Sequence, residues 1–163
     1  MKVEQLMTRP VWTCEPGDSL RVAAELMWEH DVGCVVVQRG GRVVGVITDR
    51  DICMGGYTTG LAFHEVLVGR SMGIEPTVIR AQATIDAAER LMREKRIRRL
   101  PVVDDAGTLL GLISLNDVAR EAARQLGRPV VDISSEGVAA TLAVLSAPRK
   151  AQTLVTPQPR VGV

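Results

Sequence analysis

Aromatic side chains are almost absent from this sequence. Trp, Tyr and Phe together make up 2% of its 163 residues, so a core has to be built from Val, Leu, Ile, Ala and Met. No apolar run approaches the roughly 20 residues that a transmembrane helix requires, and no N-terminal signal pattern is present. We therefore expect a cytoplasmic protein with no membrane partner.

An excess of charge of one sign is also lacking. The chain has 20 Lys and Arg residues against 19 Asp and Glu residues, which gives a formal net charge of +1 at pH 7. Nucleic-acid-binding domains usually carry a basic excess, so no nucleic-acid partner is expected. The composition, 46% apolar and 24% charged, is typical of a folded globular protein.

Cysteine and histidine are too few and too scattered to predict a metal site. Cys14, Cys34 and Cys53 show no metal-ligand spacing, and their odd number suits a reducing cytosol. His30 and His64 are isolated from any such cluster. No nucleophile with its base, paired carboxylates or phosphate-binding glycine loop is present. We therefore predict no metal, no catalytic cofactor and no enzymatic activity.

An internal duplication is the most informative feature that the sequence does contain. Residues 45–51 read GVITDRD, and residues 111–117 read GLISLND. Each copy has a glycine, an apolar pair, a hydroxyl residue and, three positions after the hydroxyl, an aspartate. Self-similarity of this kind indicates that the chain is built from two copies of one structural unit.

The residues around the two motifs predict the same order of elements in each copy: a short extended lead, a helix, two strands and a second helix. A helical apolar face is indicated in the first copy by Leu20, Ala23, Ala24, Met27 and Trp28, and in the second by Ile85, Ala88, Leu91 and Met92. Apolar runs at 34–37 and 43–47, and again at 100–103 and 109–113, flank turn residues and predict hairpins.

The two final helices are expected to differ in length. The first is predicted to stop at Gly55-Gly56, and the second to run from about residue 115 to 126 before Gly127. We divide the chain into a first repeat at 1–66, a second at 67–126 and a tail at 127–163.

The tail predicts one short helix. Residues 132–135 provide a cap, and Val138, Leu142 and Leu145 form one apolar face. Its Pro-containing end is expected to be mobile. Whether this helix packs on the repeats, on a second subunit or on a partner is left open by the sequence.

The two motifs permit two interpretations. A hydroxyl residue at a strand-to-helix junction caps the helix, and an aspartate is favoured in the first turn, so capping alone explains the pattern. Alternatively, a carboxylate at the mouth of a cleft accepts hydrogen bonds from the two hydroxyls of a ribose. The hydroxyl residue and the free N–H groups of the helix start then bind phosphate.

With both motifs in register, the chain resembles a tandem pair of CBS domains, a Bateman module, over roughly residues 1–126. The resemblance implies an α+β fold in which two β-α-β-β-α repeats pack about a pseudo-two-fold axis and leave two clefts between them. A C-terminal helical tail would follow. Such modules usually form homodimers.

The resemblance also assigns roles to residues. The aspartates would bind the ribose of an adenine nucleotide, the hydroxyl residues ribose or phosphate, and basic residues at the start of the second copy's strand would bind phosphate. The favoured cleft would combine Thr48, Arg50, Asp51, Thr77, Ile97, Arg98 and Arg99. The second cleft would combine Trp12, Val32, Gly33, Cys34, Ser114 and Asp117, and its strand offers no counter-charge for phosphate.

Two functional hypotheses follow from these assignments. The first is a stand-alone regulatory sensor that binds AMP, ADP, ATP or an NAD-like nucleotide and signals by population shift to a separate effector protein. The second is a structural dimeric adaptor without a ligand, in which the motifs act only as helix caps. The basic residues near position 98 also have a purely structural explanation, in which they form a charged surface exposed to solvent and bind no ligand.

Overall fold

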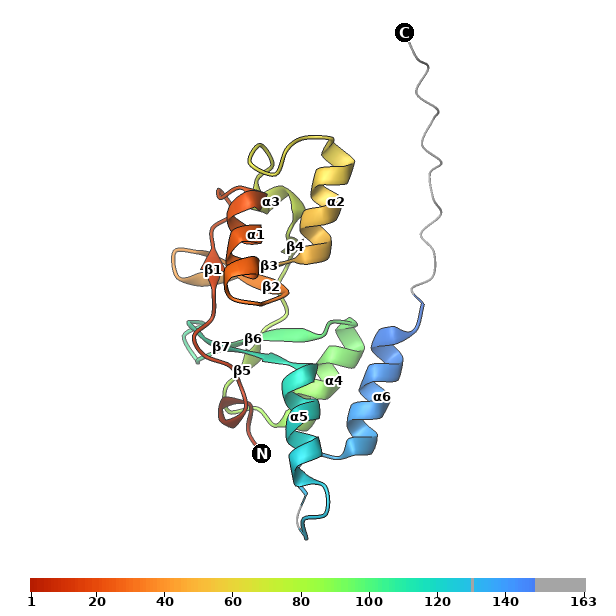
Figure 1. Cartoon of the computed structure of the whole chain (residues 1–163). Helices are drawn as coiled ribbons and strands as arrows, with labels where there is room; N and C mark the ends of the chain where they lie inside the picture. The colour runs from red at the N-terminus through yellow and green to blue at the C-terminus, as the bar shows by residue number, and fades with distance from the viewer. Residues whose placement is uncertain (130, 149–163) are drawn as a thin grey trace.

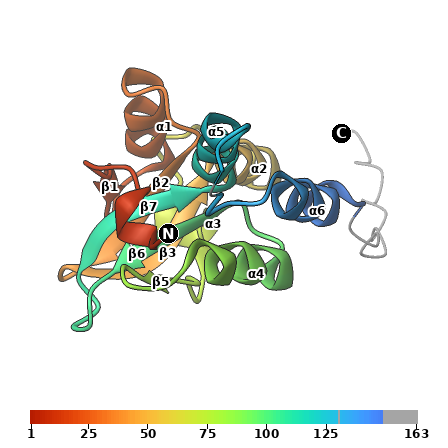
Figure 2. The same cartoon turned by 90° about the horizontal axis from the view of Figure 1, so that it is seen from below.

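Two β-sheets lie next to each other in the middle of the computed structural model, and most of the helices lie on their outer sides (Figure 1). The structure describes residues 1–129 and 131–148. Seen from below, the strands of the second sheet lie in front of those of the first (Figure 2). This is the predicted α+β architecture of two repeats. Among the described residues, no helix combines the length and apolarity needed to cross a membrane.

The two halves repeat the order lead, helix, strand, strand, helix. The first sheet has the order β1-β2-β3-β4, with β1 (Thr13–Cys14), β2 (Cys34–Arg39), β3 (Arg42–Thr48) and β4 (Gly73–Ile74). Its helices are α1 (Leu20–Glu29), α2 (Asp49–Thr59) and the short α3 (Val68–Ser71). The second sheet has the order β5-β6-β7, with β5 (Ile79–Arg80), β6 (Arg99–Val103) and β7 (Leu109–Ser114). Its helices are α4 (Ile85–Lys95) and α5 (Leu115–Gln125), and a 3₁₀ turn, η1 (Val3–Gln5), begins the chain.

The central strands are buried on both faces, which explains why they read as continuous apolar runs. Val35 and Val37 belong to the core between the first sheet and its helices. Val36 is equally buried but lies outside that core, because alternate side chains of a strand point to opposite faces. Its face of the sheet is turned toward the other repeat.

Each hydrophobic core also takes in the segment that precedes the other repeat. Val3, at the start of the chain, is fully buried in the core of the second repeat, and the Thr8 amide donates to the Leu112 carbonyl of β7 at 2.8 Å. In the same way Val68 lies in the core of the first repeat, and β4 pairs with β3. The predicted boundaries at 66 and 126 therefore separate the repeats in the sequence only. Each hydrophobic core includes residues from beyond its own boundary.

This exchange gives the two motif glycines a structural role. A Cβ atom built on Gly45 would lie 2.6 Å from Met72 Sδ and 2.8 Å from the Gly73 carbonyl oxygen. A Cβ atom on Gly111 would overlap the side chain of Met7. The exchanged segment thus crosses each β-hairpin at a position where an added Cβ atom would collide with it, with backbone at Gly45 and with the Met7 side chain at Gly111.

The predicted apolar face of the first helix was wrong at one position. Leu20, Ala23 and Met27 are buried as expected, but Trp28 is 88% exposed. The equivalent residue of the second repeat is Arg93, which contacts a further helix, α6 (Ser135–Ser146). The first repeat has no such helix, so its tryptophan remains exposed.

The prediction that the first repeat's final helix stops at Gly55-Gly56 was also wrong. Helix α2 continues to Thr59 and ends at Gly60, which has a left-handed conformation. A glycine within a helix costs only about 1 kcal/mol relative to alanine. These two glycines allow close packing, because a Cβ on Gly55 would overlap Ser71 and one on Gly56 would overlap the Phe63 ring.

The tail forms the predicted helix and packs on the second repeat, beside α4 and α5 (Figures 1 and 2). Val138 and Leu145 contact the core, but Leu142 is 50% exposed and Thr141 is fully buried in its place. The Thr141 hydroxyl accepts a hydrogen bond from Arg93 at 2.6 Å and lies 3.3 Å from Glu89 Oε1. Burial raises the pKa of the Glu89 carboxyl, while Thr141 and Arg93 oppose the shift. The expected mobility of the tail's end concerns residues outside the described ranges.

The glycine contacts predict unequal effects of two equivalent substitutions. Gly45→Ala should lower the free energy of unfolding by about 1–3 kcal/mol, because the Gly73 carbonyl is backbone and cannot turn away. Gly111→Ala should cost less, because only the flexible Met7 side chain has to move. Urea unfolding of both variants, with Gly17→Ala as a control at a position with open space, measures the difference. Equal losses at Gly45 and Gly111 would contradict this explanation.

Candidate functional site

Thr48 and Asp51 form a capping box at the start of α2. The Thr48 amide and hydroxyl donate to Asp51 Oδ2 at 2.9 and 2.7 Å, and the Asp51 amide donates back to the hydroxyl at 3.3 Å. The other carboxylate oxygen, Asp51 Oδ1, has no hydrogen-bond or ion-pair partner among residues 1–129 and 131–148. Capping therefore uses one oxygen and leaves the second for another partner.

The second motif has the same cap, but the other carboxylate oxygen of its aspartate already has a partner. The Ser114 amide and hydroxyl donate to Asp117 Oδ2 at 2.9 and 2.6 Å. Asp117 Oδ1 is bound by the guanidinium group of Arg120. Asp117 is buried, whereas Asp51 is partly exposed. The first motif thus offers an accessible acceptor, and the second offers one that already has a cationic partner.

The starts of β2 and β6 meet at the junction of the two repeats. A Cβ atom on Gly33 would lie 3.0 Å from Arg99 Nη2 and 3.9 Å from Asp49 Oδ2, so the guanidinium group occupies the space left by the glycine. Cys34 pairs with Thr48 across the first sheet, and Arg99 pairs with Ser114 across the second. Residues predicted for two separate clefts, Gly33, Cys34 and Arg99, are therefore neighbours.

The arginines of the favoured cleft are available to an anion. Arg98 and Arg50 are exposed, and Arg99 is partly buried. Within the part of the chain that the structure describes, none of the three guanidinium groups has a hydrogen-bond or ion-pair partner. A guanidinium group is permanently charged and binds phosphate in a bidentate manner.

Two of the cysteine thiols, Cys14 and Cys34, are buried. Burial raises the pKa of Cys34, and Asp49 raises it further, while the nearby Arg99 guanidinium lowers it. Burial, with a smaller effect of Asp18, raises the pKa of Cys14 to about 11. The described residues contain no group of three His, Cys, Asp or Glu side chains that could hold a metal ion.

Trp12, predicted for the second cleft, is covered on one ring face. Its ring stacks on His30 at the end of α1, with a centroid distance of 3.4 Å and an interplanar angle of 4°. Val32 and Ser114 are partly buried, as are Thr77 and Ile97. That Thr77, Ile97 and Arg98 join Asp51 in one cleft stays a prediction.

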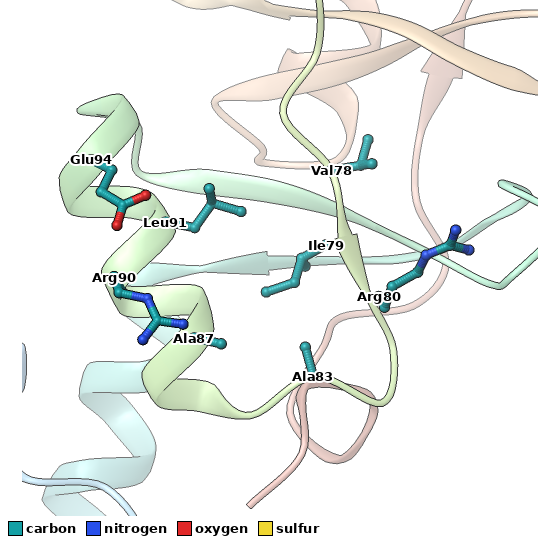
Figure 3. A pocket seen from close by; sticks show the side chains of 8 residues that line it. All are labelled: Val78, Ile79, Arg80, Ala83, Ala87, Arg90, Leu91 and Glu94. Atoms are coloured by element: carbon teal, nitrogen blue, oxygen red, sulfur yellow. The ribbon is translucent and has the colours of Figure 1, made fainter.

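Two hollows lie outside the strand junction. One, of about 320 Å³, lies between α4 and β5 and is mostly apolar (Figure 3). It contains no predicted site residue; charged side chains at its edge are Arg80, Arg90 and Glu94. The other, of about 300 Å³, is polar and is lined by Leu6, Thr8, Asp117, Arg120 and Arg124. It includes the aspartate of the second motif.

Three charged residues near the motifs were not predicted from the sequence. Asp49 lies close to the Arg99 guanidinium. Because Asp49 directly follows Thr48, it was treated as part of the motif and was not predicted as a site residue in its own right. Arg120 and Arg124 lie three and seven residues after Asp117, and this spacing places them on the same face of a helix. That periodicity was the signal that could have identified them.

The comparisons with known proteins agree with the repeat structure. A family model described as "CBS domain" matches residues 3–54 and 68–124. The CBS domain-containing protein YhcV of Bacillus subtilis is 31% identical over 138 residues, which are 83% of this chain and 97% of YhcV. The crystal structure of the CBS-domain containing protein ATU1752 from Agrobacterium tumefaciens matches with a TM-score of 0.67 and 31% identity, covering 76% of this chain and 99% of that one. The crystal structure of CBSX2 in complex with AMP matches with a TM-score of 0.65 and 31% identity, covering 78% and 98% of the two chains.

The capping boxes predict a stability effect that does not depend on any ligand. Thr48→Ala should lower the free energy of unfolding by about 1 kcal/mol, because it removes the hydroxyl that bonds both Asp51 groups. Thr48→Ser should stay within about 0.5 kcal/mol of the parent, since Ser114 makes the same cap in the second repeat. Urea unfolding of both variants checks this, and an unchanged Thr48→Ala variant would contradict it.

Proposed function

Since the chain belongs to the CBS domain family, with two copies in tandem, we propose that it is a regulatory module that binds an adenine nucleotide between its copies. The observation that carries the proposal is the Oδ1 atom of Asp51, which has no hydrogen-bond or ion-pair partner among the described residues. A ribose supplies two neighbouring hydroxyl donors, and an ionised carboxylate oxygen is the strongest acceptor for them.

The hydrogen bonds of the cap restrict what each motif residue can do. The Thr48 hydroxyl already donates its proton to Asp51, so it retains only acceptor capacity. It can accept from a ribose hydroxyl, but it cannot donate to a phosphate while the cap is formed. We therefore assign Thr48 and Asp51 to the sugar, and the phosphate to arginine side chains.

Arg98 and Arg99 are the proposed phosphate ligands, with Arg50 at the edge of the cleft. Their guanidinium groups have no other hydrogen-bond partner in the described ranges, so a phosphate displaces no existing ion pair. Thr77 and Ile97 would contact the base. AMP is the first nucleotide to test, because CBSX2, a 31% identical structure, is a complex with AMP.

Binding of this kind would regulate another protein without catalysing a reaction. A ligand that touches Asp51 in one repeat and Arg99 in the other favours the arrangement in which the repeats are close, by as much as its affinity differs between arrangements. The output would pass through a homodimer or an effector protein. The alternative is a structural adaptor, which is favoured by the complete capping boxes and predicts no nucleotide-dependent stabilisation.

Asp51→Asn separates these two functions. The asparagine oxygen can keep the cap with Thr48, while its amide group replaces Oδ1 by a donor that cannot accept from ribose. AMP at about 100 times its dissociation constant should stabilise the parent by about 2.7 kcal/mol, a rise in Tm of about 5–10 °C. The Asp51→Asn variant should unfold at nearly the parental temperature without AMP and lose binding in the favoured cleft.

The matched control is Asp117→Asn, which makes the same change in the second motif and should keep a nucleotide-dependent rise in Tm. Adenosine beside AMP tests the arginines, because Arg98→Gln with Arg99→Gln should abolish the preference for AMP. No rise in Tm with AMP, ADP, ATP or NAD would reject the sensor and leave the adaptor.

A further inference from the structure

The hollow between α4 and β5 has apolar walls and charged side chains at its edge (Figure 3). Leu91 and Ala87 point from α4 into the gap, and Ile79 points toward them from β5. Val78, which also lines the hollow, is 37% exposed. Arg80 points away from α4 and forms an ion pair with the loop after β6. A volume of about 320 Å³ is at the lower end for a small-molecule pocket, and it gives room for one branched aliphatic side chain.

Two opposite charges of α4 border this hollow without pairing. Arg90 and Glu94 both line it and are exposed. Neither side chain forms a hydrogen bond or an ion pair with any residue that the structure describes. In α1, Arg21 and Glu25 have the same order and spacing and form an ion pair at 2.7 Å. The spacing therefore permits pairing, and the charges of Arg90 and Glu94 remain available to a ligand.

The first repeat lacks this combination of groups. Helices α1 and α4 begin at Leu20 and Ile85, and from these positions the two helices align residue by residue. The equivalents of Ala87, Arg90 and Glu94 are Val22, Glu25 and Glu29. A valine fills part of the space that an alanine leaves, and two carboxylates replace a pair of opposite charges. The combination is thus a property of the second repeat's sequence and not of the fold that both repeats share.

We propose that this hollow binds a free apolar α-amino acid of the size of valine, leucine or isoleucine. The Arg90 guanidinium would hold the carboxylate of the ligand in a bidentate manner, and Glu94 would hold its ammonium group. Residues four apart on a helix are neighbours, with about 5–6 Å between their Cβ atoms, and an α-amino acid carries both charged groups on one carbon. The apolar walls would remove the ligand's side chain from water.

The two charges select a zwitterion over other apolar ligands. An aliphatic carboxylic acid would pair with Arg90, but its carboxylate would lie near the Glu94 carboxylate, and like charges repel at this distance. An aliphatic amine would pair with Glu94 and meet the opposite conflict at Arg90. A ligand with both charges satisfies both side chains at once. The hollow contains no residue of the cleft proposed for the nucleotide, so either site can exist without the other.

Isothermal titration of L-leucine into the whole chain, up to the solubility limit of the amino acid, tests the proposal. Two derivatives each lack one charge: leucinamide has no carboxylate, and N-acetyl-leucine has no ammonium group. The parent should bind L-leucine and should bind each derivative about ten-fold more weakly or worse, because a hydrogen bond between charged groups is lost. Glycine, which has no side chain for the hollow, should also bind more weakly than leucine.

Each variant should remove one of these preferences. Arg90→Gln should bind leucine about ten-fold more weakly and should no longer distinguish it from leucinamide. Glu94→Gln should no longer distinguish leucine from N-acetyl-leucine. Ala87→Val, which introduces the residue of the first repeat, should weaken leucine binding by filling the hollow. The matched control is Glu29→Gln, the same change at the equivalent position of α1, and it should bind leucine as the parent does.

The outcomes separate this inference from the proposed function. Failure of the folded parent to bind leucine, isoleucine or valine would overturn the amino-acid site, and so would leucine binding that neither Arg90→Gln nor Glu94→Gln changes. AMP titrated into the same samples tests the nucleotide cleft independently, because its binding should be unchanged in both variants and lost from the favoured cleft in Asp51→Asn. Circular dichroism of each variant verifies that it is folded.

Discussion

The exchange of backbone segments between the two repeats is the constraint on which the rest of the structure depends. The chain's first residues complete the core of the second repeat, and the segment before the second repeat completes the core of the first. Neither half can therefore be packed fully without the other. Gly45 and Gly111 leave the space in which these segments cross, so the glycines that begin the motifs serve the fold before they serve any ligand.

The same arrangement brings residues of both repeats together at the junction. Because the sheets are held against each other, the starts of β2 and β6 meet, and Arg99 of one repeat lies against Gly33 of the other. The capping boxes fix the position of each aspartate on its helix. The repeats thus share the same cap but differ in their charges, because Arg99 begins β6, whereas Arg120 and Arg124 lie on α5.

The fold could be predicted from the sequence because duplication, strand periodicity and capping patterns are local and occur twice. The errors arose where contacts from distant segments decided the outcome. Trp28 is exposed because no helix covers it, α2 continues past Gly55-Gly56 because close packing needs those glycines, and Thr141 replaces Leu142 beneath α6 because Arg93 and Glu89 bind its hydroxyl. At the site, the motif residues were identifiable, but the different partners of Asp51 and Asp117 required three-dimensional contacts.

The central claim is that a nucleotide joins the two repeats through the first motif. A crystal structure of the chain grown with AMP tests it most directly. We expect ribose hydroxyls on Asp51 Oδ1 and the phosphate against Arg98 or Arg99, with the Thr48 cap intact. AMP bound only in the apolar hollow between α4 and β5, with the Asp51 carboxylate free, would contradict it.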